Sequence, residues 1–208
     1  MKETIHSTLQ LIRLAEKLKF ELRHSWLSNG RRESVAEHTW QMALMAILIH
    51  KYLSQPVNLE KTLKMILIHD LIEAEVGDIP FFEKSPRKDA KQKMEQQAIE
   101  NIKNQLNSET GDEIYDLWYE FEAYNTPEAK FAKALDNLEV QIQHNLAQFE
   151  TWEEIEYDLV YNKMDQYCEY DPFLKELCQE IKAEAEDKMI KGGIDVQSVK
   201  ARATRQNS

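Results

Sequence analysis

Apolar residues recur at steps of three and four along most of this chain, the spacing that places them on one face of an α-helix. The pattern predicts helices over residues 4–20, 34–52, 63–77, 86–106, 113–124, 126–149 and 171–191. Two of the starts carry a second signal. Ser34 is followed three residues later by Glu37, the capping-box pattern, and Thr126 is followed by a proline at the first helical position. The chain is therefore predicted to be built from helices.

Composition supports a single all-α domain. The chain has 208 residues, which is enough for one sizeable core. It contains five glycines and five prolines, too few for the many turns of a β-rich protein. We expect a helical bundle over residues 1–194, followed by a polar and flexible tail over residues 195–208.

The charge balance restricts the classes of partner. The formal net charge is −11, whereas proteins that bind long nucleic acids carry clustered basic residues. No apolar run reaches the ~18 residues of a membrane span. Two cysteines, Cys168 and Cys178, are too few for a disulfide framework, which favours a reducing compartment. We therefore expect a cytoplasmic protein that binds neither a membrane nor a long nucleic acid.

The most apolar of the predicted helices contains two adjacent polar residues, His69 and Asp70. Apolar residues flank the pair on both sides, so both side chains are expected close to the core. Glu73 lies one helical turn beyond them, on the same predicted helix surface. A buried carboxylate is costly unless a cation pairs with it. A metal ion would satisfy all three groups, whereas hydrogen bonds to the backbone are the simpler explanation of an isolated His-Asp pair.

Two further polar residues occupy inward positions on other predicted helices. His38 lies on the apolar stripe of helix 34–52, and Asp136 lies at the edge of the stripe of helix 126–149. Taken alone, such a histidine is more often a hydrogen-bonded core residue than a metal ligand. The near-buried carboxylate again requires a partner.

A short segment before the second predicted helix is unusually basic. Residues 21–32 contain Ser, Asn and Gly, which predicts a loop, and also Arg23, Arg31 and Arg32. Beside a metal site, these arginines would suit an anionic substrate. The alternative is that they pair with surface carboxylates.

In order along the chain, His38, His69-Asp70 and Asp136 form the pattern H…HD…D. This set resembles the HD-domain metal-dependent phosphohydrolases, which are helical bundles, over residues from about 11 to 149. The surrounding sequences R-H-S-W, R-R-E-S-V-A-E-H-T, H-D-L-I-E-A-E-V-G-D-I-P and K-A-L-D-N-L-E are similar to the 5'-deoxynucleotidase branch of that family. Members of this branch remove phosphate from deoxynucleoside monophosphates.

The resemblance implies a role for each residue that matches the family's motif. His38, His69, Asp70 and Asp136 would bind the metal, Glu73 and Asp78 would be the catalytic carboxylates, and Arg23 would contact the substrate phosphate. His24 stands where the bacterial deoxynucleotidases have a tryptophan associated with selecting deoxyribose, and Trp26 follows two residues later. We expect His24 and Trp26 to border the sugar or base, with weaker selection of the deoxy form.

The donor set also suits a catalytic metal site on chemical grounds. Two imidazoles and two carboxylates leave positions open for water on one divalent Mn, Co, Fe, Ni or Zn ion. Such a water ionises near neutral pH and could attack phosphorus. Glu73 or Asp78 could position the water or protonate the leaving 5'-oxygen, and the sequence does not divide these two roles.

Three other functions share parts of this pattern. A two-metal HD phosphodiesterase would need further paired histidines, and the spacing of His6, His24, His50 and His144 does not provide them. A guanosine-polyphosphate hydrolase would use the same ligands on a different substrate. A non-enzymatic, metal-stabilised binding module would keep its function without Glu73. The expected partner is a small nucleotide, and assembly into a homodimer is left open.

Overall fold

The structure is a computed structural model that describes residues 1–206. The helices are α1 (Lys2–Ala15), α2 (Val35–Ile49), α3 (Leu59–His69), α4 (Glu73–Val76), α5 (Pro86–Gln105), α6 (Ser108–Ala123), α7 (Pro127–Leu146), α8 (Glu154–Asn162), α9 (Asp165–Cys168), α10 (Pro172–Lys191) and α11 (Val196–Gln206). Short 3-10 turns are η1 (Glu16–Lys19), η2 (His50–Tyr52) and η3 (Phe149–Thr151), and two strands are β1 (Leu22–Trp26) and β2 (Arg32–Ser34). The predicted all-α class is confirmed.

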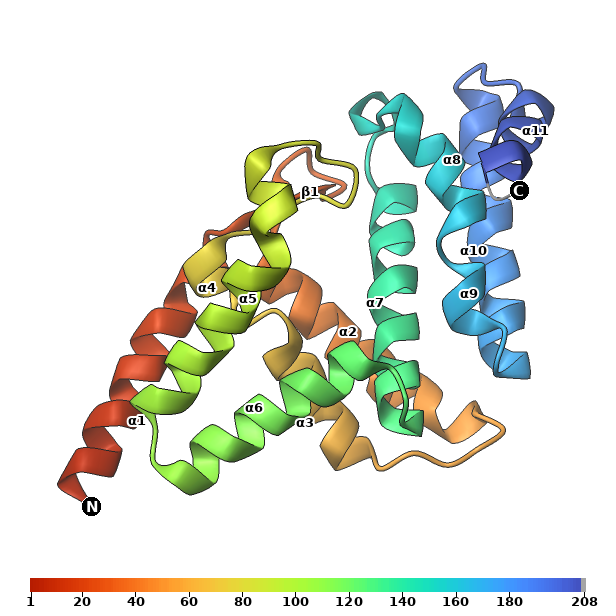
Figure 1. Ribbon diagram of the computed structural model, residues 1–208. Helices are drawn as coiled ribbons and strands as arrows, with labels where there is room; N and C mark the ends of the chain where they lie inside the picture. Colours follow the sequence, from red (N-terminus) through yellow and green to blue (C-terminus); the bar gives the residue numbers. More distant parts are fainter. Residues whose placement is uncertain (207–208) are drawn as a thin grey trace.

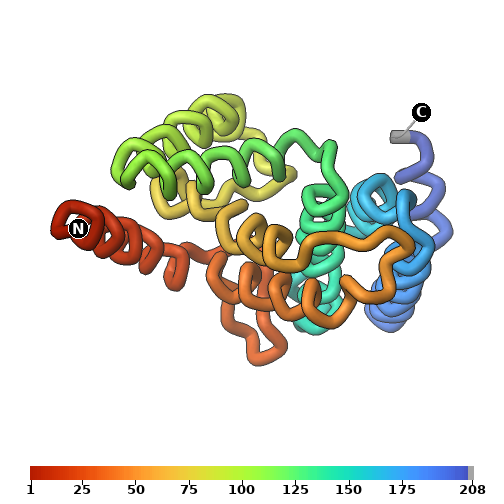
Figure 2. Tube along the Cα trace, turned by 90° about the horizontal axis from the view of Figure 1, so that it is seen from below, coloured from red at the N-terminus to blue at the C-terminus, as the bar shows by residue number. Residues whose placement is uncertain are grey.

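Helix α7 lies between two groups of helices (Figure 1). On one side are α1, α4, α5 and α6, and on the other are α8 to α11, so that the two ends of the chain lie at opposite ends of the molecule in both views (Figures 1 and 2). One apolar core joins α2, α3, α7 and α10, and a second lies among η1, α4, α5 and α6. No helix among residues 1–206 is both long and apolar enough to cross a membrane.

The predicted starts of α2 and α7 have the capping geometry that their sequences indicate. Ser34 and Glu37 form the reciprocal capping box of α2, and the Thr126 hydroxyl accepts the main-chain N–H of Ala129 at the start of α7. These two helices carry His38 and Asp136. Their well-defined first turns therefore fix the positions of two candidate site residues.

The basic segment 21–32 was expected to be a loop, and the structure shows a β-hairpin instead. Strands β1 and β2 pair antiparallel, with an irregular register between Leu22 and Trp26. Arg32 stabilises the pairing, because its Nε and Nη2 atoms donate to the main-chain carbonyls of Arg23 and Leu22 at 2.7 and 2.8 Å. Arg31 pairs with the exposed carboxylate of Glu37. Two of the three arginines thus have local partners.

The predicted helix 63–77 is interrupted. Helix α3 ends at His69, Asp70 is its C-cap residue with φ −101° and ψ 11°, and Glu73 begins the separate short helix α4. Gly77 ends α4 at φ +76°, a conformation that favours glycine. The expectation that His69, Asp70 and Glu73 share one continuous helix surface is therefore wrong, because the break turns Glu73 independently of α3.

The predicted flexible tail is largely a helix. Val196, Val199 and Ala203 form a short buried stripe on α11, which contacts α8. Arg202 Nε donates to both carboxylate oxygens of Asp158 on α8, at 2.8 and 2.9 Å. Such a short apolar stripe in a polar sequence gives little periodic signal, and its burial depends on α8. The last part of the predicted tail, residues 207–208, lies outside the described residues.

Candidate active site

Four side chains from three helices meet beside a pocket, and two of them, Asp70 and Asp136, line it. His38 lies in the first turn of α2, His69 and Asp70 lie at the end of α3, and Asp136 lies in α7. One donor atom each of His38, His69 and Asp136 lies within 4.8 Å of the other two. Asp70 Oδ2 lies 3.1 Å from His69 Nε2 and 3.8 Å from His38 Nε2. The structure thus brings together all four residues that the sequence pattern indicated as metal ligands.

Second contacts fix the orientation of both imidazole rings. His38 Nδ1 lies 2.5 Å from Oε2 of the buried Glu139, and His69 Nδ1 donates to the main-chain oxygen of Ile66 at 2.6 Å. A ring that donates from Nδ1 keeps the lone pair of Nε2 free for a metal. Glu139 lies three residues after Asp136, in the quoted segment K-A-L-D-N-L-E, but the sequence analysis gave it no role. Its contact with His38 joins residues 101 positions apart.

The electrostatics of this group favour a bound cation. The Nε2 atoms of His38 and His69 are buried and make no hydrogen bond within residues 1–206. Burial alone lowers the pKa of His38, but Glu139 and Asp136 outweigh burial and raise this pKa to about 10. Burial raises the pKa of Asp70 and Asp136, yet their imidazole neighbours hold both values well below the ordinary range. The mixed imidazole and carboxylate donor set therefore fits a divalent transition metal.

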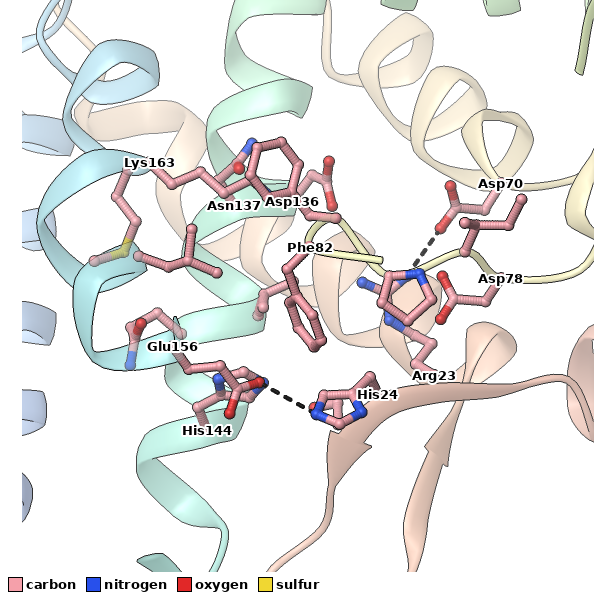
Figure 3. Close-up of a pocket in the computed structure, with 18 of the residues that line it drawn as sticks. Arg23, His24, Asp70, Asp78, Phe82, Asp136, Asn137, His144, Glu156 and Lys163 are labelled. Carbon is pink, nitrogen blue, oxygen red and sulfur yellow. Dashed lines mark hydrogen bonds and ion pairs between the residues drawn. The ribbon is translucent and has the colours of Figure 1, made fainter. Parts of the chain in front are cut away.

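The metal-binding group opens into a pocket of about 1050 Å³ that includes open solvent at its mouth (Figure 3). Arg23, Asp70 and Asp78 lie on one side in Figure 3, and His144 and Glu156 lie on the other. The pocket is therefore long enough to have two chemically distinct ends.

Glu73 and Asp78 both line this pocket, next to Asp70. Glu73 is 6% exposed, and its Oε2 makes no hydrogen bond within the described part of the chain. Burial and the charges of Asp70 and Asp78 raise the pKa of Glu73 well above its ordinary value. Asp78 lies in the loop after α4, where its main-chain N–H donates to Glu21 at 3.1 Å. The two residues thus differ, because the Glu73 side chain is buried, whereas Asp78 lies in a loop whose main chain is held by Glu21.

Arg23 contacts a predicted metal ligand directly. Its Nη1 donates to Asp70 Oδ2 at 3.2 Å, and its Nε lies 3.7 Å from the buried Glu33. This position beside Asp70 was not expected from the sequence. Further positive charge in the lining comes from three lysines that the sequence analysis did not single out, Lys88, Lys91 and Lys163. Their sequences are ordinary amphipathic helix surfaces, so only the fold shows that they face the pocket.

The two predicted aromatic contacts of the hairpin have different positions. His24 lines the pocket, whereas Trp26 is not part of the lining. Trp26 packs edge-on against the His24 ring, with a centroid distance of 4.9 Å, and Phe82 does the same at 5.0 Å. Because the register of β1 is irregular, the consecutive residues Arg23, His24 and Ser25 face the pocket instead of alternate ones. The predicted direct role of Trp26 therefore has no support in this geometry.

Fold and site together define a helical protein with a cluster of histidine and aspartate side chains, suited to a metal ion, beside a pocket. The chain belongs to the HD domain family, whose sequence model matches residues 15–190. This match confirms the family resemblance expected from the H…HD…D pattern.

Named relatives match about two thirds of this chain. The chain is 36% identical over 139 residues to the human protein named 5'-deoxynucleotidase HDDC2, a match that covers 66% of each protein. It is 39% identical over 137 residues to the protein of that name from Danio rerio, covering 65% of this chain and 66% of the relative. The match thus spans slightly less than two thirds of the length of these relatives.

A solved structure is similar over nearly the whole chain. A crystal structure from Magnetospirillum magnetotacticum MS-1, described as a predicted metal-dependent phosphohydrolase, is 28% identical with a TM-score of 0.76. The match covers 91% of this chain and 95% of that one.

Proposed function

We propose that this protein is a metal-dependent phosphomonoesterase that hydrolyses (deoxy)nucleoside 5'-monophosphates to nucleoside and phosphate. The observation that carries the proposal is the convergence of His38, His69 and Asp136 within 4.8 Å, next to a pocket that Asp136 and the buried Glu73 both line. The relatives named 5'-deoxynucleotidase and the neighbour described as a phosphohydrolase support the same activity.

The proposed cofactor is one divalent Mn, Co, Fe, Ni or Zn ion held by His38, His69, Asp70 and Asp136. When bound, such an ion lowers the pKa of coordinated water and offsets charge on the phosphoryl group. The contacts of His38 with Glu139 and of Asp70 with Arg23 hold two of the ligands in place. Arg23 therefore has a positioning role at Asp70 in addition to its proposed attraction for phosphate.

The two catalytic carboxyl groups suit opposite proton transfers. Burial and the charges of Asp70 and Asp78 raise the pKa of Glu73, which favours its protonated form, so its proton can pass to the leaving 5'-oxygen as the phosphorus–oxygen bond breaks. Asp78 lines the pocket from the loop beyond α4 and can accept a proton from the attacking water. Lys88, Lys91 and Lys163 add positive charge around the phosphate.

The sugar would lie beside α7 and the hairpin. Asn137 Nδ2 donates to the main-chain oxygen of Lys133, and its buried Oδ1 makes no hydrogen bond within residues 1–206, so this oxygen can accept one from a sugar hydroxyl. His24 is smaller than tryptophan and can hydrogen-bond a 2'-hydroxyl, so selection of the deoxy form should be weak. The ratio of kcat/KM for dAMP and AMP should rise in His24→Trp. An equal ratio in both proteins would place the discrimination elsewhere.

A phosphate-release screen tests the proposed function. The purified protein, stripped of metal and then supplied with each divalent metal in turn, should release phosphate from nucleoside 5'-monophosphates. Glu73→Gln should lose this activity, whereas Glu75→Gln, an exposed glutamate in the same short helix, should keep it. Absence of phosphate release with every metal would reject the proposal.

We also propose that the protein is cytoplasmic and forms a homodimer. Trp40, Leu44, Ile47 and Leu48 are exposed on successive turns of α2, an apolar face that a second copy could cover. Cys168 and Cys178 are both free thiols, as a reducing compartment favours. Light scattering of the wild-type protein and Leu48→Lys tests the dimer, which the variant should weaken.

A further inference from the structure

The end of the pocket opposite the metal-binding group has a chemistry of its own. Asp136, Val140 and His144 follow one another at steps of four along α7, and all three line the pocket. At 1.5 Å per residue, the α-carbons of Asp136 and His144 are about 12 Å apart. Helix α7 is therefore a wall that runs from the metal ligands to a second group of polar side chains, His24, His144 and Glu156.

Glu156 is the anchor of this second group. It is 3% exposed and lies at the third position of α8, where its Oε2 accepts the main-chain N–H of Glu153 at 2.7 Å. This capping-box contact fixes the direction of the carboxyl group. Its other oxygen, Oε1, lies 3.6 Å from Nε2 of both His24 and His144, just beyond hydrogen-bond distance (Figure 3). Because Glu156 lines the pocket and Oε2 is held by the main chain, Oε1 is the oxygen that can accept a hydrogen bond from a ligand.

The geometry does not suit a second metal ion. His24, His144 and Glu156 are absent from the sets of donor atoms within residues 1–206 that all lie within 4.8 Å of one another. Burial lowers the pKa of His144 to about 4, so this ring is neutral at pH 7 and gives Glu156 no full positive charge. The capping box holds one oxygen of Glu156, whereas the other has only the two imidazoles, at 3.6 Å, as its polar neighbours.

The surrounding side chains suit a flat ring. Val140, Leu159, Met164 and Phe82 line the same pocket as apolar walls. Pockets of this kind bind the apolar faces of a ligand and orient it through a few polar groups. A nucleoside monophosphate with its phosphate at the metal-binding end would extend along α7 and present the edge of its base to Glu156.

We propose that Glu156 is a specificity-determining residue whose Oε1 accepts a hydrogen bond from an exocyclic amino group of the nucleobase. Adenine and cytosine carry this group, whereas hypoxanthine and uracil carry an oxo group at the same position. The proposal rests on the proposed function, because it names the substrate class of the same site. A carboxylate placed against an oxo group leaves two acceptors facing each other, so the oxo bases are disfavoured.

Pairs of substrates that differ in this one group measure the effect. At pH 8.5, where Glu156 is charged, kcat/KM should be at least about tenfold higher for dAMP than for dIMP, and likewise for dCMP over dUMP. Wild-type ratios near one, with phosphate released from all four, would overturn this inference and leave the proposed function standing. No release from any nucleotide would reject both.

Glu156→Gln gives the sharper test because glutamine also forms a capping box. The amide oxygen must take the place of Oε2, where it accepts the Glu153 N–H, so the amide NH₂ then faces the pocket. The preference should fall at least tenfold and move towards dIMP and dUMP. Glu154→Gln, two residues away and with an 80% exposed side chain, is the matched control and should leave both ratios unchanged.

Two measurements distinguish base recognition from a general structural effect. An equal loss of kcat/KM on all four nucleotides, and on 2-deoxyribose 5-phosphate, which has no base, would overturn the proposal. Calorimetry in the presence of a chelator should show tighter binding of 2'-deoxyadenosine than of 2'-deoxyinosine by the wild-type protein, and the reverse by Glu156→Gln. Equal binding of the two nucleosides by the wild-type protein would also overturn it.

Discussion

The two ends of the pocket are built from the same kinds of side chain, histidine and carboxylate, yet their chemistry differs. At the metal-binding end, charged neighbours hold the pKa of Asp70 and Asp136 low. At the far end, burial dominates and raises the pKa of Glu156 to about 7. The imidazoles differ in the same way. Carboxylate neighbours raise the pKa of His38, whereas burial lowers the pKa of His144. Residue type alone therefore does not define a metal site, and the surrounding charge decides.

The largest expected effect comes from removing a metal ligand. His38→Ala and Asp70→Ala should lose the bound metal, because each leaves the remaining donors with an incomplete coordination shell. Hydrolysis should fall to the level seen without added metal. Metal content by elemental analysis checks this, and retention of stoichiometric metal in both variants would contradict the assignment. His144→Ala, at the far end, should keep its metal.

Replacing the proposed acid should separate chemistry from ligation. Glu73→Gln should keep its metal content but lower kcat by about 10² to 10⁴, the usual contribution of a positioned acid or base. Elemental analysis and steady-state kinetics on one preparation provide both numbers. Unchanged kcat would show that Glu73 is not the proton donor and is only a lining residue of the pocket.

The buried carboxylate behind His38 should affect metal affinity more than chemistry. Glu139→Gln keeps the size of the side chain but weakens the contact that orients His38. Metal affinity should fall about 10- to 100-fold, the range typical of outer-shell partners. Competition with a chelator measures this affinity. Activity at saturating metal should recover in large part, and a variant that binds metal as tightly as the wild-type protein would refute the positioning role.

The pH dependence of the free energy of unfolding should show that the pKa of Glu156 is raised in the folded protein. The pKa of Glu156 is about 7 in the folded protein, against an ordinary value of 4.5. Between these values the folded state holds a proton that the unfolded state has lost, so this group's contribution to the free energy of unfolding falls as pH rises from about 4.5 to 7. His144, with its lowered pKa, contributes in the opposite direction, and Glu153 and His24 also face the group.

Because these contributions oppose each other, the comparison is between proteins. The free energy of unfolding of the wild-type protein minus that of Glu156→Gln should decrease across pH 4.5 to 7 and then stay level. Urea unfolding at half-unit pH steps measures both curves. A constant difference would show that Glu156 titrates in the same range in the folded and unfolded protein.

The smallest expected effect concerns the helix that supports the far end. Arg202 on α11 pairs with Asp158 on α8, the helix that carries Glu156. Arg202→Ala should lower the free energy of unfolding only slightly, because solvent screens a partly exposed ion pair. Metal affinity should not change, since α11 packs mainly against α8 and α10, which carry none of the proposed metal ligands. Urea unfolding measures the change in stability, and metal titration measures the metal affinity. Weaker metal binding would show that the far end of the pocket and the proposed metal site are coupled.

The sequence by itself determined the helical class and singled out the four polar residues that the fold brings together at the proposed metal site. His38 and Asp136 could be recognised because helical periodicity is local, so an inward polar residue interrupts an apolar stripe that is visible in sequence. The His69-Asp70 pair stands out for the same reason. The sequence did not reveal the break after His69, because the apolar run continues through Leu71 and Ile72 without a proline or glycine.

Only the tertiary structure decided which other residues share the site. Glu139 meets His38 across 101 positions, and Gln143 bonds the main chain of Trp26 across 117. Sequence can suggest the capping role of Glu156, which is local. Only the packing of α8 beside α7 and the hairpin places its Oε1 near His24 and His144 in the pocket. Periodicity specifies the face of a helix, whereas the neighbour that this face meets depends on long-range packing that no local pattern encodes.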